Sequence, residues 1–255
     1  MGEPSSSRSD GAAVAADVES ASDDFRFWRL FSVTFNVKGA PPWASVADEA
    51  LAKLLPQDKV RQCDVVSVSL QETPLSALGT TGLYDEQYLR VMSLHLAEMG
   101  FVEMFAPYRQ MSLVLCVFLR RRYLGCVSRV EFDSLRTGEL GNKGCLAVRL
   151  TLSDGTHLSI LNCHLQPTNE RLTGRIQEWH SVVEWVKFSQ ATELEISNDY
   201  VICAGDLNFR VDFPSSDGAV RYLQEDPAFQ EHFLKSDQLN RCRALGEAFS
   251  GFEEG

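Results

Sequence analysis

The sequence predicts an α/β fold in which two β-sheets pack together and helices cover them. Three observations lead to this expectation. From Phe25 onward, short runs rich in Val, Leu, Ile and Phe alternate with polar segments, and two of these runs are separated by a hairpin signal. Between the runs, apolar residues recur at helical spacing. The 255 residues, 44% of them hydrophobic, suffice for one large domain with a sizeable core.

Six segments have the apolar, β-branched composition of strands. They are Leu30–Val37, Asp64–Leu70, Met111–Leu119, Cys145–Leu152, His157–Leu165 and Tyr200–Ala204. The fourth and fifth segments are joined by Ser153-Asp154-Gly155, a turn signal that predicts an antiparallel hairpin. The last segment is short and apolar, as a buried strand is.

Two further stretches place apolar side chains on one helical face. The first contains Tyr84, Tyr88, Val91, Met92 and Leu96, and the second contains Leu172, Ile176, Trp179, Val183 and Val186. Residues 1–24 are rich in Ser, Ala, Asp and Gly and show no periodicity. We therefore expect a disordered tail over 1–24 and a single domain over 25–255.

The composition limits the class of protein. The net charge of −11 argues against non-specific nucleic-acid binding, which needs a basic surface, but it leaves room for a basic pocket or a bound metal ion. Seven Cys residues, none in a CxxC pair, predict reduced thiols rather than a disulfide framework. There is no apolar run of eighteen residues and no signal-peptide core, so we expect a cytoplasmic protein.

Five segments place polar side chains where a predicted strand should end. They are Phe35-Asn36-Val37, Leu70-Gln71-Glu72, Leu140-Gly141-Asn142-Lys143-Gly144, Asn162-Cys163-His164-Leu165 and Ala204-Gly205-Asp206-Leu207-Asn208-Phe209-Arg210. Each one alone is typical of a turn, a helix cap or a structural polar residue. Together they supply the residue types of a metal-assisted phosphoryl site.

The chemistry of phosphate esters explains these residue types. The ester is anionic, and a hard cation such as Mg²⁺, held by oxygen ligands such as Glu72 and Asn36, neutralises it. Water needs a base, and Asp206 is suited to orient and activate it. The transition state spreads charge over the equatorial oxygens, which need hydrogen-bond donors. The donors available are His164, Asn208 and Lys143.

The same segments resemble the signature motifs of the inositol polyphosphate 5-phosphatases. Gly205–Arg210 resembles GDLN[YF]R, Gly141–Gly144 resembles GNKG, and Asn162–Leu165 resembles N-x-H-L. Thr34–Val37 is similar to TWNV and Gln71-Glu72 to the QE pair. The order and separation of all five motifs fit, and the match runs from about residue 27 to the end. The wording most resembles the subgroup of the skeletal-muscle-and-kidney-enriched and proline-rich phosphoinositide 5-phosphatases.

This resemblance implies a deoxyribonuclease I-like fold within the endonuclease/exonuclease/phosphatase superfamily. It also implies Mg²⁺-dependent removal of the 5-phosphate from phosphoinositides, such as the 4,5-bisphosphate or 3,4,5-trisphosphate, or from soluble inositol phosphates. Mapped onto this chain, it assigns the metal to Asn36 and Glu72, catalysis to His164, Asp206 and Asn208, and substrate binding to Asn142, Lys143, Arg175 and Arg210.

The sequence departs from the family mainly at its end. Lys235–Leu239 and Phe252–Gly255 resemble the DQL and F-x-EG stretches, but the PTYKYD-like, WCDR and SDH segments that follow in the family are absent. We therefore expect an incomplete catalytic domain that lacks its C-terminal strands. Phe35 replaces the usual Trp, the loop over 137–143 is shorter than in relatives, and no second His follows His164. These changes affect the pocket rather than the family.

Two alternatives to the enzyme stay open. One is a catalytically dead remnant that keeps a binding surface, and the other is a nuclease on the same fold, against which the GNKG and GDLNFR motifs and the acidic charge argue. Arg120-Arg121-Arg122 would suit an anionic membrane surface, although a solvated strand end is the interpretation we favour. The sequence identifies no protein partner, and peripheral membrane contact is expected only through a lipid substrate.

Overall fold

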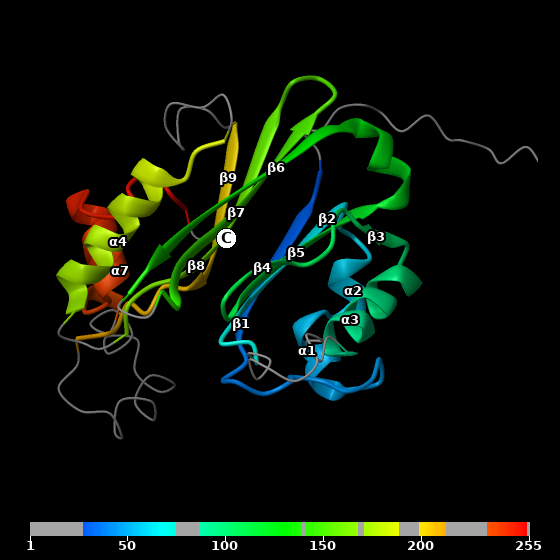
Figure 1. Ribbon diagram of the computed structural model, residues 1–255, viewed down its shortest axis with the longest axis horizontal. Helices are drawn as coiled ribbons and strands as arrows, with labels where there is room; N and C mark the ends of the chain where they lie inside the picture. The colour runs from blue at the N-terminus through cyan, green and yellow to red at the C-terminus, as the bar shows by residue number, and fades with distance from the viewer. Residues whose placement is uncertain are drawn as a thin grey trace, which may run out of the picture.

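The computed structural model describes residues 28–74, 87–138, 141–167, 171–188, 199–212 and 234–253. Within these residues two β-sheets lie face to face, and helices cover their outer faces (Figure 1). The predicted α/β sandwich is therefore confirmed. The predicted tail over 1–24 falls outside the described residues.

The first sheet has the order β1-β2-β5-β3, with β4 also paired to β5. Its strands are β1 (Leu30–Asn36), β2 (Val65–Gln71), β3 (Phe101–Glu103), β4 (Tyr108–Gln110) and β5 (Leu113–Arg120). β1 runs parallel to β2, and β5 runs antiparallel to β2. Every residue of β2 is buried, because the strand lies between a helical layer and the second sheet. The three strands predicted here end within three residues of their expected positions.

The second sheet has the order β6-β7-β8-β9. Its strands are β6 (Val127–Thr137), β7 (Lys143–Leu152), β8 (His157–His164) and β9 (Tyr200–Asp206). β7 and β8 pair antiparallel across the predicted turn, so the hairpin is confirmed, while β8 and β9 run parallel. β6 was not predicted, because charged residues such as Arg129 and Asp133 interrupt its apolar positions at this sheet edge.

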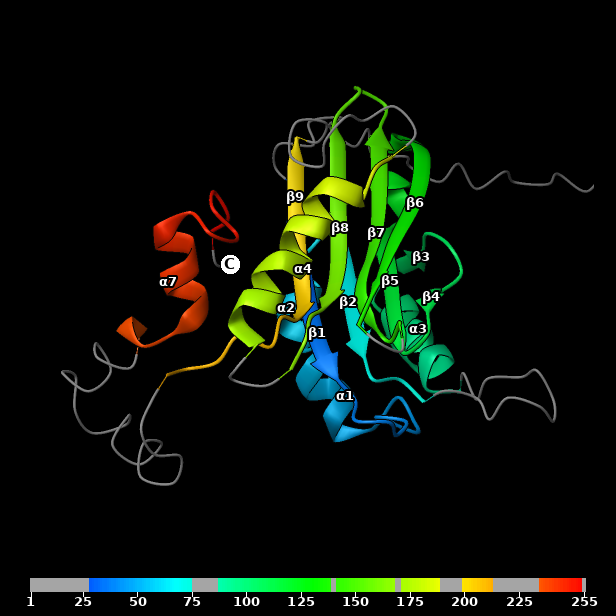
Figure 2. The same ribbon diagram turned by 60° about the vertical axis from the view of Figure 1, so that its left-hand side comes forward.

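Helices cover the outer face of each sheet (Figures 1 and 2). On the first sheet lie α1 (Glu49–Leu54), α2 (Gln57–Val60) and α3 (Gln87–Glu98), and on the second lies α4 (Leu172–Trp185), with α7 (Gln238–Leu245) packed beside α4. The helices α3 and α4 correspond to the two predicted helical faces. A 3₁₀ segment, η2 (Arg121–Cys126), follows β5. None of the helices within the described ranges is both long and apolar enough to cross a membrane.

The core has three apolar layers, and the sheet strands contribute to each of them by alternation. Between the sheets, β5 side chains such as Leu115 and Val117 meet β7 and β8 side chains such as Val148 and Ile160. The second layer lies between the first sheet and α1–α3, and the third lies between the second sheet and α4 and α7. Parallel neighbouring strands finish at the same end of a sheet. The carboxyl ends of β1 and β2 therefore lie together, as do those of β8 and β9.

Candidate active site

The polar strand ends of the two sheets meet at one edge of the sandwich. Asn36 ends β1 and Asp206 ends β9, and the amide Nδ2 of Asn36 donates a hydrogen bond of 2.9 Å to Asp206 Oδ2. Glu72 directly follows β2, and His164 ends β8. Lys143 begins β7, which runs antiparallel to β8 and therefore starts where β8 ends. The sequence-predicted residues Asn36, Glu72, Lys143, His164 and Asp206 are thus brought together, and we refer to these five residues as the strand-end cluster.

His164 lies at the centre of the strand-end cluster. Its side chain is 1% exposed, and its Nε2 atom lies 3.8 Å from Glu72 Oε1 and 3.8 Å from Asp206 Oδ2. The ammonium Nζ of Lys143 lies 2.6 Å from the same Nε2 atom. Burial first, and the charge of Lys143 second, lower the pKa of His164 to about 4, although Asp206 and Glu72 act in the opposite direction. The imidazole is therefore neutral at physiological pH and accepts a hydrogen bond from Lys143.

Lys143 is the cation that the two carboxylates share. Partial burial lowers the pKa of the Lys143 ammonium, while the nearby charges of Glu72 and Asp206 raise it. The residue reaches the cluster because Gly144, which follows it, passes close to β6. A Cβ atom on Gly144 would lie 1.9 Å from the carbonyl oxygen of Leu135. The glycine of the G-N-K-G segment is thus required by this close approach between strands.

Three cluster segments hold a non-glycine residue in the left-handed region. Lys38 has φ of 54°, Glu72 has φ of 53° and Asn208 has φ of 56°. Such residues are uncommon, and surrounding contacts must hold them in place. At Glu72, the backbone carbonyl accepts a hydrogen bond of 2.7 Å from the N–H of Gly39, which ties the turn after β2 to the turn after β1. The Glu72 side chain remains 44% exposed, so its carboxylate faces the open side of the cluster.

The turn after β9 is organised by Asn208. Its backbone N–H donates to Asp206 Oδ1 at 3.2 Å, and its Nδ2 donates to the carbonyl of Leu165 at 2.9 Å. Its Oδ1 accepts from Nη2 of Arg210 at 2.7 Å. Asn208 therefore fixes the Asp206 carboxylate, and it places the exposed guanidinium of Arg210 beside the cluster. Asn142 is also exposed and lies next to Lys143 in the chain.

Arg175, predicted to bind substrate, belongs to α4. Its side chain is fully buried, and its guanidinium donates to the carbonyl of Gln166 at 3.3 Å and to Oε1 of Gln238 at 2.6 Å. Gln238 in turn donates to Asp212 and accepts from the backbone of Arg210. Burial first and the charge of Arg210 second lower the pKa of Arg175. These contacts indicate that Arg175 ties α4 to α7 and to the turn after β9.

A buried polar link lies directly behind the cluster, and sequence reasoning missed it. Asn162 of β8 is fully buried, and its Nδ2 donates to the carbonyls of Val114 at 2.8 Å and Leu70 at 3.1 Å in the opposite sheet. Its Oδ1 accepts from Nε2 of Gln71 at 2.7 Å. Both residues stand in the matched motifs, as the Asn of N-x-H-L and the Gln of QE. We call the pair of Asn162 and Gln71 the inter-sheet link, because it joins the segments that carry His164 and Glu72.

The oxygen donors of the cluster fit a hard divalent cation. Mg²⁺ is usually held by one or two carboxylates together with water and substrate phosphate, rather than by a cage of protein ligands alone. Glu72 offers a half-exposed carboxylate, and Asn36 and Asp206 offer oxygens at the same edge. Among the described residues, no group of three or more His, Cys, Asp or Glu side chains could hold a metal ion unaided. Two carboxylates and one amide oxygen at one edge are ligands of the kind that a hard divalent cation takes.

Comparisons with known proteins agree with this chemistry. Residues 33–255 match endonuclease/exonuclease/phosphatase family 2. The chain is 30% identical over 245 residues to the type II inositol 1,4,5-trisphosphate 5-phosphatase of Mus musculus, covering 89% of this chain and 23% of that protein. It is 26% identical over 231 residues to inositol polyphosphate 5-phosphatase K of Mus musculus, covering 88% of this chain and 47% of that protein. The chain thus spans about a quarter and about half of their lengths, and the predicted subgroup stays a prediction.

A solved structure shows the same fold. It is the inositol polyphosphate 5-phosphatase domain of SPsynaptojanin in complex with inositol (1,4)-bisphosphate and calcium ion, which superimposes with a TM-score of 0.74 at 20% identity. The likeness covers 89% of this chain and 65% of that one. The deoxyribonuclease I-like arrangement of two mixed sheets between helical layers, expected from the motifs, is therefore confirmed.

Proposed function

Because the chain belongs to endonuclease/exonuclease/phosphatase family 2, we propose that it removes the 5-phosphate from phosphoinositides or soluble inositol phosphates, with Mg²⁺ as its cofactor. The observation that carries the proposal is the strand-end cluster, in which a buried neutral histidine stands between two carboxylates and one ammonium. The named relatives are 5-phosphatases, and the synaptojanin domain binds an inositol bisphosphate and a divalent ion. Phosphatidylinositol 4,5-bisphosphate and 3,4,5-trisphosphate are the lipid substrates we propose.

Glu72 and Asn36 would hold the Mg²⁺ ion. When bound, the ion supplies positive charge to the phosphoryl oxygens and neutralises the ester. Asn36 holds Oδ2 of Asp206 and the backbone N–H of Asn208 holds Oδ1, so the carboxylate is fixed at the cluster and is suited to orient a water molecule toward phosphorus. The carboxylate needs no large movement to do so, because both of its oxygens already accept hydrogen bonds.

His164, Lys143 and Arg210 act on the phosphoryl oxygens. A phosphate that enters the cluster attracts the Lys143 ammonium, which then releases Nε2 of His164. Once Lys143 has moved, the neutral imidazole in the tautomer that carries its proton on Nε2 donates this N–H to the equatorial oxygens, and Lys143 contributes a point charge. The exposed guanidinium of Arg210 lies next to the turn after β9 and is suited to bind a further phosphate of the inositol ring. Asn142 would contribute to the same substrate surface.

The test is the release of inorganic phosphate from short-chain phosphatidylinositol 4,5-bisphosphate in Mg²⁺, with this chain and a longer product of its reading frame assayed together. We expect His164→Ala and Asp206→Ala each to lower the rate at least about a hundredfold. Lys187→Ala, beyond the end of α4, is the matched surface control and should leave the rate unchanged. Release that is insensitive to both cluster variants would refute the site. If neither protein releases phosphate, the inactive binding remnant is favoured. Cleavage of DNA without phosphate release would favour a nuclease.

Cytoplasmic location with transient membrane contact is part of the same proposal. The membrane contact is proposed because related enzymes are named for lipid substrates, such as the phosphatidylinositol 4,5-bisphosphate 5-phosphatase A of Homo sapiens, which is 27% identical to this chain over 234 residues. Sedimentation with vesicles that contain the lipid substrate, compared with phosphatidylcholine vesicles, tests it. Equal sedimentation with both kinds of vesicle would argue against lipid recognition.

A further inference from the structure

Two neighbouring hollows lie at the end of the first sheet opposite to the strand-end cluster. The first, of about 420 Å³, is lined by Arg61, Arg120, Arg121 and Arg122 around the start of β2 and the end of β5. The second, of about 610 Å³, lies between α3 and β3. Arg121 lines both hollows, so they form one continuous surface. We refer to this surface as the Arg121 groove.

The first hollow is strongly positive in a chain whose net charge is −11. Four guanidiniums line it with a single carboxylate, that of Asp64, and this carboxylate already pairs with Nη2 of Arg122 at 3.2 Å. Arg61 and Arg121 are exposed, and within the described residues the Arg121 side chain has no hydrogen bond or ion pair with the protein. Four like charges held together with a single carboxylate among them favour an anionic ligand.

Arg120 holds this arrangement in place. Its Nε donates to the carbonyl of Cys63 at 2.8 Å, its Nη1 donates to the carbonyl of Met99 at 2.5 Å, and its Nη2 donates to the carbonyl of Arg61. The guanidinium lies 4.3 Å from the centroid of the Phe101 ring. The half-buried Arg120 side chain therefore fixes the shape of the first hollow, which is more than a group of extended surface side chains.

The second hollow is apolar. Its floor is formed by Leu89, Phe101 and Phe118, which are 2%, 2% and 1% exposed. On its rim Leu94 of α3 is 59% exposed, so its side chain is open to a ligand in the hollow. It borders β3, which pairs only with β5 among the described strands and so presents a sheet edge. This hollow is suited to one or two apolar side chains.

The position of the groove argues against a membrane as its occupant. The groove lies at the start of β2, and Glu72 of the cluster follows the end of that seven-residue strand. At about 3.3 Å per residue the two sites are separated by roughly 25 Å along the sheet. A membrane bound at the groove would hold the cluster away from lipid headgroups. A small free anion would fill only the first hollow and would leave Leu94 exposed.

We propose that the Arg121 groove docks an acidic peptide segment of a partner protein. Carboxylates of the segment would pair with Arg61, Arg121 and Arg122, and an aliphatic or aromatic side chain would fill the hollow beside Leu94. Charge complementarity supports this choice, as does the pairing of a basic with an apolar hollow, which is how arginine-rich interfaces and helix-face grooves recognise short motifs. The proposal is independent of catalytic activity.

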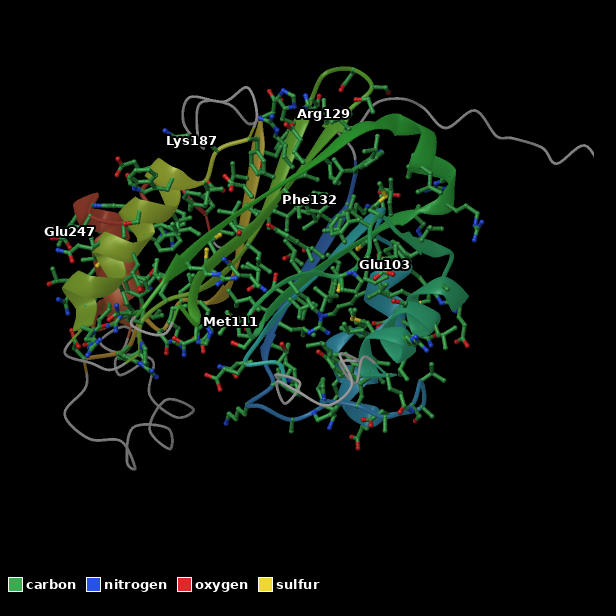
Figure 3. All side chains as sticks on the ribbon, viewed as in Figure 1. Glu103, Met111, Arg129, Phe132, Lys187 and Glu247 are labelled. Carbon is green, nitrogen blue, oxygen red and sulfur yellow. The ribbon has the colours of Figure 1, made fainter. Side chains whose placement is uncertain are left out.

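The test begins with selection of a randomised peptide display library on the whole chain. The selected peptides are expected to combine two or more acidic residues with a Leu, Ile, Phe or Trp. The best peptide is then labelled, and its Kd is measured by fluorescence anisotropy with four proteins. These are the wild type, Arg121→Glu, Leu94→Asp and Lys187→Glu, the last a matched charge reversal that lies well apart from the groove, as the labels of Lys187 and Glu103 in Figure 3 show.

We expect Arg121→Glu and Leu94→Asp each to raise Kd at least about tenfold, and Lys187→Glu to change it less than about twofold. Both altered groove residues are exposed, so thermal melts should stay within a few degrees of wild type. The proposal is overturned if no peptide is selected, or if the selected peptides bind with equal affinity to Arg121→Glu. It is also overturned if Arg121→Glu instead abolishes binding to phosphatidylserine vesicles, or if it dissociates a dimer in sedimentation velocity, since these outcomes would name a membrane or a second copy.

Discussion

The inter-sheet link predicts a specific loss when Asn162 is replaced by Ala. The side chain is fully buried and makes three hydrogen bonds, two to carbonyls of the opposite sheet and one from Gln71. Each buried hydrogen bond contributes about 1 kcal/mol net, so Asn162→Ala should lower the free energy of unfolding by about 3 kcal/mol. The loss should not be much larger, because Nε2 of Gln71 keeps its bonds to Ser69 and Thr34.

The same substitution should disturb the site. His164 stands two residues after Asn162, and Glu72 follows Gln71, so release of the link lets the two sheets shift at the cluster. We expect phosphate release to fall about tenfold or more, because misplacement by a fraction of an ångström is costly in catalysis. An NMR titration gives a readout that does not depend on activity. The pKa of His164 should move upward from about 4 as water reaches the ring.

Cys163→Ala is the matched control for this prediction. Cys163 is equally buried and adjacent in β8, but it faces the α4 layer rather than the opposite sheet. We expect it to cost about 1 kcal/mol and to leave the His164 titration unchanged. Urea unfolding of the three proteins measures the first quantity. If Asn162→Ala and Cys163→Ala shift stability equally, and neither moves the His164 titration, the link has no positioning role.

Two further predictions concern the cluster. Gly205 has φ of 136°, and a Cβ atom there would lie 1.9 Å from the carbonyl oxygen of Cys163 in β8, so Gly205→Ala should lower the free energy of unfolding by at least about 3 kcal/mol. Gly155 has φ of 91° and open space around it, so Gly155→Ala should lower it by only about 1 kcal/mol. Equal losses in urea unfolding would show that the backbone angle alone matters. In metal-free protein, the pKa of His164 is about 4 when folded and 6.5 when unfolded, so the unfolded state binds the extra proton and stability falls as pH drops from 6.5 toward 4. In urea titrations with a chelator, His164→Gln should reduce the dependence of the free energy of unfolding on pH between 4 and 6.5. The same dependence in the variant and the wild type would contradict the lowered pKa of His164.

The strand ends could be predicted because each is marked by an abrupt change in the sequence. An apolar run that stops at Asn36, Glu72, His164 or Asp206 identifies both the strand and its polar end, and parallel pairing then places such ends at one edge. The prediction that these residues act together rested on their residue types and on the resemblance of the motifs, and the structure supplies the geometry. It required no knowledge of which strands are neighbours, since both parallel pairs deliver their ends to the same side of the sandwich.

Other features left no local signal. β6 alternates charged and apolar residues because it lies at a sheet edge, where Arg149 of the next strand pairs with Glu131 at 2.5 Å. Arg175 resembled a substrate ligand because its position in the sequence follows His164, but only the three-dimensional arrangement shows that it is buried against Gln238. The link between Asn162 and Gln71 joins residues 91 positions apart, so no periodicity could reveal it.

The charges of the site explain why a divalent cation and a phosphate suit it together. Two carboxylates, Glu72 and Asp206, face two cations, Lys143 and Arg210, around a histidine that burial keeps neutral. The site is thus close to electroneutral before substrate enters. A phosphate monoester adds almost two negative charges, and a partly buried site tolerates an uncompensated charge poorly. A divalent cation restores the balance, so each of the two should bind more tightly in the presence of the other.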